Sequence, residues 1–495
     1  MRIIIAFVTI GSLVAGTHRM FAAEQSSNGK CTELTALRLP DVKVTEAVAV
    51  AAASSGAIRV AHCRVTGVIG TEIRFSLLLP DNWNQKFFMG GGGGFVGSIQ
   101  NSAQTTVNLG FATAGTDTGH QGSGTDASWA HNNIERQVNF GYLAVHRTAE
   151  TAKAIIAGYY GQPTTRNYFQ GCSRGGGQAL MEAQRFPADF DGIISGAPAY
   201  DWTGIAATMI RNMQALFPNP NKIDALMFTP ELLKTVETKI LESCDKQDGI
   251  GDGVIDDPRQ CKVDVNALPL TPAQKNALKV IYAPTMNQDG ELYPGQPFGG
   301  EGQTAGWPTW ITGVKPPAAG QAPSLRFAFG TGIVKYLVFN DPNWDYSKYN
   351  FASWKKDSEL AGSFLNATNP DLSAFGSRGG RLILWHGWAD PALTPLASIR
   401  YHEQVYARDP KAASYFRTFL MPGVLHCGGG AGPDTADWTE AIVQWVEHGK
   451  APERVVATKM QGAQVARSRP LCPHPQKAVY NGTGSTDDEK NFACR

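Results

Sequence analysis

Residues 167–186 read NYFQGCSRGGGQALMEAQRF, and this stretch decides the fold. Residues 167–169 predict a strand, and residues 178–186 have the apolar spacing of a helix. Between them, residues 171–175 fit the pattern G-x-S-x-G. Between a strand and a helix, this pattern is typical of a nucleophile elbow, a sharp turn that exposes a serine above the edge of a sheet. We therefore predict that Ser173 is a nucleophile.

Two later residues complete a triad in the chain order serine, acid, histidine that accompanies such an elbow. Asp390 lies just past the end of a predicted strand, and His426 lies in the loop after the last predicted strand of the sheet. His426 would accept the proton of Ser173, and Asp390 would fix the imidazole tautomer. His386 is a rival base, but it precedes the acid and is better explained as a structural residue. The histidines before the elbow are discounted on the same grounds of order: His120, His131 and His146.

The neighbours of the proposed nucleophile and base are both cysteines. Cys172 directly precedes Ser173, and Cys427 directly follows His426. A disulfide holds its two Cα atoms about 4.4–6.8 Å apart. A Cys172–Cys427 bridge would therefore bring the serine and the histidine within reach of each other.

Composition limits the class of protein. The chain has 495 residues and a net charge of +1, so it has no broad charged field for nucleic acid or a membrane surface. Arg2 and the apolar run at 3–14 predict a signal peptide over residues 1–23. The eight cysteines that follow are even in number, which indicates disulfides in an exported, secreted or periplasmic protein. A zinc site is the alternative, but the chain has no C-x-x-C pair.

Strands and helices alternate in two separate parts of the chain. Predicted strands at 71–79 and 86–89 and a predicted helix at 142–160 precede the elbow, which indicates a mostly parallel sheet covered on both faces. From about 201 to 351 this rhythm stops, and it resumes after Arg378. We expect an α/β-hydrolase fold with an inserted lid domain, divided as follows: hydrolase domain, first part, 24–200; lid domain, 201–370; hydrolase domain, second part, 371–495.

The glycine run at 90–94 follows the predicted strand 86–89. Such a loop supplies one backbone amide of the oxyanion hole in many esterases, and the residue after the nucleophile supplies the other. We expect Gly93 and Arg174 to be these two donors.

The sequence resembles the tannase and feruloyl esterase family, which includes mono(2-hydroxyethyl)terephthalate hydrolases. The resemblance rests on several stretches: 115–120, 171–176, 185–192, 378–390 and His426-Cys427. It implies a disulfide between the neighbours of the catalytic serine and histidine, a lid after the elbow helix, a structural calcium ion and esters of aromatic acids as substrates.

The acidic loop CDKQDGIGDGV at 244–254 resembles the calcium loop of that family. Calcium prefers six to eight oxygen ligands on a flexible loop. The expected ligands are three carboxylates and two backbone carbonyls, from Asp245, Asp248, Asp252, Ile250 and Val254. Proximity and likeness to the family indicate three further disulfides: Cys244–Cys261, Cys31–Cys63 and Cys472–Cys494.

The predicted activity is hydrolysis of small aromatic esters through an acyl-enzyme, without an organic cofactor. Trp307, Trp310 and Phe329 are candidates to stack on an aromatic acyl group, and Arg326 is a candidate to pair with a free substrate carboxylate. A feruloyl-esterase-like specificity is favoured narrowly over a tannase or a mono(2-hydroxyethyl)terephthalate hydrolase. A non-catalytic binding protein on a hydrolase scaffold is the rival of another class, but such proteins usually lose the serine or the histidine. A calcium-dependent interaction module has only one loop in its support, and the oligomeric state stays open.

Overall fold

The computed structural model describes residues 29–220, 223, 225–318 and 320–495. The predicted signal peptide lies outside the described residues. In the described residues, the central sheet has nine strands in the order β1-β2-β3-β5-β4-β6-β7-β10-β11. Their bounds are β1 (Val42–Val50), β2 (His62–Ile69), β3 (Ile73–Pro80), β4 (Lys86–Gly90), β5 (Ala112–Thr116), β6 (Arg166–Cys172), β7 (Gly192–Gly196), β10 (Arg381–Gly387) and β11 (Phe416–Met421).

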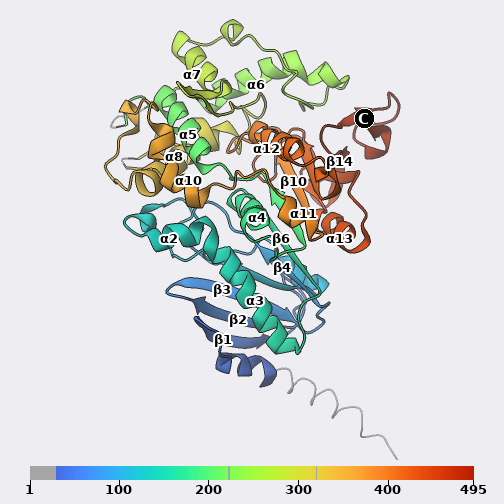
Figure 1. Ribbon diagram of the computed structural model, residues 1–495. Helices are drawn as coiled ribbons and strands as arrows, with labels where there is room; N and C mark the ends of the chain where they lie inside the picture. Colours follow the sequence, from blue (N-terminus) through green and yellow to red (C-terminus); the bar gives the residue numbers. More distant parts are fainter. Residues whose placement is uncertain (1–28, 221–222, 224, 319) are drawn as a thin grey trace, which may run out of the picture.

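The sheet is antiparallel at one end and parallel over the rest. β1, β2, β3 and β5 pair with antiparallel neighbours, whereas the run β5-β4-β6-β7-β10-β11 is parallel throughout. Because parallel strands end at the same edge, the residues that follow β4, β6, β10 and β11 meet there (Figure 1). This arrangement confirms the predicted α/β-hydrolase fold.

Helices cover both faces of the parallel part. Side chains alternate along each strand: in β4, Phe87 and Met89 belong to one buried cluster and Phe88 to the other. The first cluster includes residues of α3 (Ala144–Tyr160), α4 (Arg174–Arg185) and α12 (Pro395–Arg408), and the second includes residues of α13 (Trp438–His448). None of the helices in the described ranges is both long and apolar enough to cross a bilayer.

A long insertion separates two neighbouring strands of the sheet. β7 pairs with β10, yet residues 197–380 lie between them in sequence and add no strand to the central sheet. Part of the insertion has its own apolar core, which contains Leu233, Ile240 and Leu278. Its elements are α5 (Trp202–Leu216), α6 (Pro230–Cys244), α7 (Pro272–Tyr282), β8 (Thr285–Asn287), β9 (Gly290–Tyr293), α8 (Leu325–Gly332), α9 (Trp354–Asp357), α10 (Glu359–Leu365) and α11 (Ser373–Ser377).

The remaining elements are small. A short helix precedes α3, and two small sheets follow β11 toward the C-terminus. Their bounds are α2 (Ile134–Val138), β12 (Thr435–Ala436), β13 (Val455–Gln461), β14 (Gln464–Leu471), β15 (Ala478–Tyr480) and β16 (Phe492–Cys494). Four disulfides join the eight cysteines in the four predicted pairs, which confirms them: Cys31–Cys63, Cys172–Cys427, Cys244–Cys261 and Cys472–Cys494.

Candidate active site

Ser173 occupies the tight turn between β6 and α4. Its φ of 62° and ψ of −121° lie in a region that non-glycine residues rarely adopt. The turn is possible because its neighbours lack side chains: a Cβ on Gly171 would lie 2.4 Å from the backbone of Gly175, and one on Gly176 would lie 2.2 Å from that of Gly196. The glycines therefore allow the strained conformation that exposes the serine.

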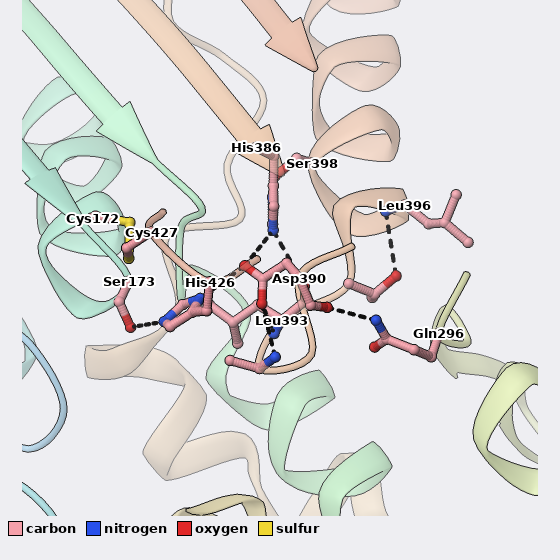
Figure 2. A network of polar contacts seen from close by, with 12 residues as sticks. Cys172, Ser173, Gln296, His386, Asp390, Leu393, Leu396, Ser398, His426 and Cys427 are labelled. Carbon is pink, nitrogen blue, oxygen red and sulfur yellow. Dashed lines mark hydrogen bonds and ion pairs between the residues drawn. A yellow bond between two sulfur atoms is a disulfide. The ribbon is translucent and has the colours of Figure 1, made fainter. Parts of the chain in front are cut away.

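The structure brings Ser173, His426 and Asp390 into one hydrogen-bonded chain. Nε2 of His426 lies 2.8 Å from Oγ of Ser173, and Nδ1 of His426 lies 2.8 Å from Oδ2 of Asp390 (Figure 2). Because an ionised carboxylate only accepts hydrogen bonds, Nδ1 carries the proton and Nε2 is free to accept that of the serine. This is the arrangement required of a nucleophile and its general base.

Asp390 is completely buried, and every contact of its carboxylate favours the ionised form. Oδ1 accepts hydrogen bonds from the amides of Ala392 and Leu393, and Oδ2 lies 3.1 Å from Nε2 of His386 (Figure 2). Burial alone would raise the pKa of Asp390, but the charge of His426 and the hydrogen bonds of both histidines hold it well below its usual range. The acid is therefore an anion that orients His426.

The disulfide Cys172–Cys427 joins the residue before the nucleophile to the residue after the base. Its Cα atoms lie 5.9 Å apart (Figure 2). The bridge links the end of β6 to the loop that follows β11, two segments 255 residues apart in sequence. It therefore limits how far Ser173 and His426 can separate.

A cavity of about 70 Å³ adjoins the triad. Ser173 and His426 line it together with Trp310 and Phe329, two of the predicted substrate contacts. The indole of Trp310 meets the ring of His426 edge to face at 4.8 Å and stacks with Phe329 at 6.1 Å. Most of the other lining residues are apolar: Ala199, Trp202, Ile205, Met209, Ile333 and Leu393. The cavity is suited to a flat apolar group beside the nucleophile.

The other two predicted substrate contacts lie elsewhere. Trp307 is completely buried in the core of the insertion, where it packs against Tyr282. Arg326 is also buried, and its guanidinium donates hydrogen bonds to Oε1 of Gln296 and to the carbonyl of Ala392. Neither side chain lines the cavity, because each is already committed to the packing or hydrogen bonding of the protein.

The two expected oxyanion donors come from the start of α4 and from the loop that follows β4. Arg174 is the first residue of α4, so its amide has no acceptor within the helix. The amide of Gly93 donates to Oε1 of Gln100, whereas its neighbour Gly94, with a φ of 58°, lines the cavity beside Ser173. In the glycine run it is therefore Gly94, and not the expected donor Gly93, that lies at the cavity.

The Arg174 side chain is buried without a carboxylate partner in the described part of the chain. Its Nη2 donates to the carbonyls of Phe140 and Gly141, and the guanidinium lies over the rings of Phe140 and Trp202 at 4.4 and 5.3 Å. Burial lowers the pKa of Arg174 to about 9. The cation therefore persists at neutral pH and contributes positive potential near the nucleophile.

The acidic loop of the insertion forms local hydrogen bonds. Oδ1 of Asp245 accepts from the amides of residues 252–254, and Oδ1 of Asp248 accepts from the amide of Ile250. Oδ2 of Asp252 pairs with Arg469 at 2.8 Å and with Arg467 at 3.3 Å.

One group of three described residues places possible metal ligands within 4.8 Å of one another, and it lies outside the acidic loop. It consists of His146, Glu182 and Asp189. Nδ1 of His146 and Oδ2 of Asp189 are hydrogen-bonded at 2.6 Å, and Lys153 pairs with the other oxygen of Asp189. The position of this lysine favours an internal ion-pair network.

Sequence reasoning missed several residues of the site. Trp202, Ile205 and Met209 reach the cavity from α5, and Gln296 donates to the carbonyl of Asp390. They come from the irregular-looking insertion, and none belongs to a recognisable motif. His386, which the sequence analysis named as a structural residue, lies 3.1 Å from Oδ2 of Asp390.

Comparisons with known proteins indicate one and the same family over nearly the whole chain. A family model described as "Tannase and feruloyl esterase" matches residues 57–495. Mono(2-hydroxyethyl) terephthalate hydrolase of Piscinibacter sakaiensis is 31% identical, covering 95% of this chain and 91% of that protein. Feruloyl esterase B of Aspergillus niger is 30% identical, covering 87% and 86% respectively. The crystal structure of feruloyl esterase B from Aspergillus oryzae superposes with a TM-score of 0.83 at 27% identity, over 95% of this chain and all of that one.

Proposed function

This chain belongs to the tannase and feruloyl esterase family of carboxylic ester hydrolases, and we propose that it cleaves esters of aromatic acids through a Ser-His-Asp acyl-enzyme mechanism. The observation that carries the proposal is the hydrogen-bonded chain Ser173–His426–Asp390 beside an aromatic cavity. His426 takes the proton of Ser173 as the serine attacks the ester carbonyl. The imidazole then protonates the leaving alcohol, and a water molecule activated by His426 releases the acid.

The negative charge that develops on the carbonyl oxygen needs backbone donors. We assign this role to the amide of Arg174 and to the glycine loop, with Gly94 in place of Gly93. Support comes from Gly94 lining the cavity, while the Gly93 amide is occupied by Gln100. Removing one such donor typically costs about 10²–10³-fold in kcat.

The acyl group occupies the cavity that Trp310 and Phe329 line together. Their aromatic rings suit contact with a planar aromatic acid. Arg326 is committed to Gln296 and Ala392, so it is not free to pair with a second carboxylate of the substrate. This favours feruloyl-type substrates over terephthalate monoesters.

The insertion acts as a lid, and we assign it residues 201–370. Helix α5 and residues 310–333 supply much of the cavity wall, so the substrate is enclosed by the insertion on one side and by the triad on the other. The lid therefore selects among esters that share one mechanism.

A structural calcium ion on the acidic loop is the second part of the proposal. The residues fit a hard cation: burial raises the pKa of Asp248, and the charge of Asp252 raises it further. Next to the loop, Oδ2 of Asp256 is buried and has no hydrogen-bond partner in the described residues, and Nζ of Lys477 lies 3.8 Å from it. Bound calcium would add its positive charge to that of the two arginines that pair with Asp252. Asp245, Asp248, Asp252 and the carbonyls of Ile250 and Val254 would hold it.

The protein is exported to the periplasm or the medium. The four disulfides support this proposal, because such bonds persist in oxidising compartments.

A series of esters tests the function. The series consists of methyl ferulate, methyl gallate, a terephthalate monoester and a long-chain acyl ester. We expect the highest kcat/KM on methyl ferulate and little turnover of the long-chain ester. Preference for the long-chain ester would overturn the aromatic specificity, and no turnover of any ester would overturn the function itself.

A further inference from the structure

Two buried side chains of the insertion donate hydrogen bonds to the loop that holds the catalytic acid. Nε2 of Gln296 donates to the carbonyl of Asp390 at 2.5 Å (Figure 2). Nη2 of Arg326 donates to Oε1 of Gln296 at 2.7 Å, and Nε of Arg326 donates to the carbonyl of Ala392 at 3.2 Å. Both side chains are only 4% exposed, so water does not replace these bonds.

The loop between β10 and α12 carries Asp390 and is called the acid loop here, as distinct from the acidic loop at 244–254. Its hydrogen bonds show why the two donors matter. Oδ1 of Asp390 uses the amides of Ala392 and Leu393, so the loop wraps around its own carboxylate. The carbonyls of residues 390 and 392 accept from Gln296 and Arg326. The loop is thus held from inside by the carboxylate and from outside by the insertion.

The charge of Arg326 also bears on the acid. Its hydrogen bonds go to neutral oxygens, and the carboxylate of Asp390 is the negative charge that acts on it most. Burial lowers the pKa of Arg326 to about 10, so it remains a cation at neutral pH. A buried cation near Asp390 favours the ionised carboxylate on which the tautomer of His426 depends.

We infer that Arg326 and Gln296 are positioning residues, which act through the backbone of Asp390 and Ala392 to hold the acid in line with His426. The inference rests on the proposed Ser-His-Asp mechanism. It makes a docked lid a condition for an assembled triad, because the two donors belong to the insertion and the two acceptors to the sheet domain. Errors of about 1 Å in such positioning can cost roughly 10²-fold in rate.

Two other roles for Arg326 make different predictions. A residue that binds a substrate carboxylate would raise KM for terephthalate monoesters alone when it is replaced. A residue that only stabilises the lid would lower the melting temperature but leave kcat of the folded enzyme unchanged. A positioning residue lowers kcat for every ester and leaves KM nearly constant.

The variants are Arg326→Met, which keeps an unbranched apolar stem but removes the guanidinium, and Gln296→Leu, which keeps a similar shape without the amide. Arg326→Lys keeps the charge. The matched control is Gln303→Leu, because Gln303 is a glutamine of the insertion that donates to Glu237 and has no contact with the acid loop. Each is assayed for kcat and KM on methyl ferulate and a terephthalate monoester, for the rate of labelling by a fluorophosphonate, and for melting temperature.

We expect Arg326→Met and Gln296→Leu each to lower kcat about 10–100-fold on both esters, with KM within twofold and labelling slowed in proportion. Arg326→Lys should recover part of the loss, and Gln303→Leu should behave like the wild type. The double variant Arg326→Met/Gln296→Leu should lose little more than either single one, because the two residues form one network.

The inference is overturned if both variants keep kcat within twofold of the wild type, or if the loss appears only in KM for the terephthalate monoester. A variant with a reduced melting temperature is assayed 20 °C below its own transition, so that unfolding does not imitate the effect. Failure of the proposed function differs from both results, because the wild type itself would then neither turn over an ester nor react with the fluorophosphonate.

Discussion

Replacing Cys172 and Cys427 together by alanine tests the link between covalent structure and catalysis. The bridge closes a loop of 255 residues. The chain-entropy relation gives about 5.5 kcal/mol for a loop of this length at 25 °C, and losses measured for native disulfides lie at about 2–5 kcal/mol. We expect the free energy of unfolding to fall by about 4 kcal/mol.

Activity should fall in addition to stability, because the bridge joins the immediate neighbours of Ser173 and His426. A displacement of about 1 Å between nucleophile and base would lower kcat about 10²-fold. The matched control is Cys472→Ala/Cys494→Ala, which opens a loop of 22 residues between β14 and β16 in the C-terminal region. The same relation gives about 3.4 kcal/mol for it.

The assay combines urea unfolding with kcat on methyl ferulate at a temperature where both variants are folded. We expect both variants to lose stability, but only Cys172→Ala/Cys427→Ala to lose turnover. This expectation is refuted if the two variants lose turnover equally, or if Cys172→Ala/Cys427→Ala keeps kcat within threefold of the wild type. Peptide mapping without reductant provides a direct check, because a free thiol at either position would also refute it.

Four further predictions concern separate parts of the molecule. Ser173→Ala should lower hydrolysis by at least about 10⁴-fold and abolish labelling by a fluorophosphonate without changing the circular dichroism spectrum, and labelling at another serine would contradict the assignment. Glu301→Gln should raise the free energy of unfolding by about 1–3 kcal/mol at pH 8 and leave it unchanged at pH 4. Burial raises the pKa of Glu301 to about 7, so above the usual carboxyl pKa the native state holds a proton that the unfolded state has lost. The native state therefore loses stability as pH rises toward and through 7. An equal gain at both pH values would exclude this cause. Removing calcium with a chelator should lower the melting temperature, with turnover lost only as the lid loosens, and instant inactivation without a thermal shift would contradict a structural role. Trp310→Ala should weaken the preference for methyl ferulate over aliphatic esters about tenfold, whereas Trp307→Ala should reduce stability and leave the ranking of substrates unchanged, and the opposite result would place Trp307 at the substrate.

The part of the site that could be predicted from the sequence has local causes. A strained serine between a strand and a helix needs small neighbours, so the elbow is visible as glycines around Ser173. The cysteines beside Ser173 and His426 predict a contact between two segments far apart in sequence, which local patterns of hydrophobicity cannot predict. The last strand that the sequence predicts before His426, residues 416–421, coincides with β11, in which the apolar residues Phe416, Phe419 and Met421 are buried.

The remaining residues depend on tertiary contacts that no local pattern encodes. Among the five identical glycines at 90–94, tertiary contacts distinguish the residue at the cavity from its neighbour: Gly94 lines the cavity, whereas the amide of Gly93 donates to Gln100. Arg326 resembles a substrate ligand in sequence because aromatic residues surround it, yet burial directs its guanidinium to Gln296 and Ala392. Helix α5 was hidden in the sequence because its apolar residues point both to the sheet domain and to the cavity, which removes a simple amphipathic period.

The separation of the catalytic residues along the chain has a consequence for synthesis. Ser173 leaves the ribosome 253 residues before His426, a delay of about 13–50 s at elongation rates of about 5–20 residues per second. For most of that interval β10 and β11 are also missing, so the edge of the sheet that receives Asp390 and His426 does not yet exist. A nascent chain or a product of premature termination therefore holds a serine without its base, and it cannot carry out the triad mechanism on the esters of the cell that makes it.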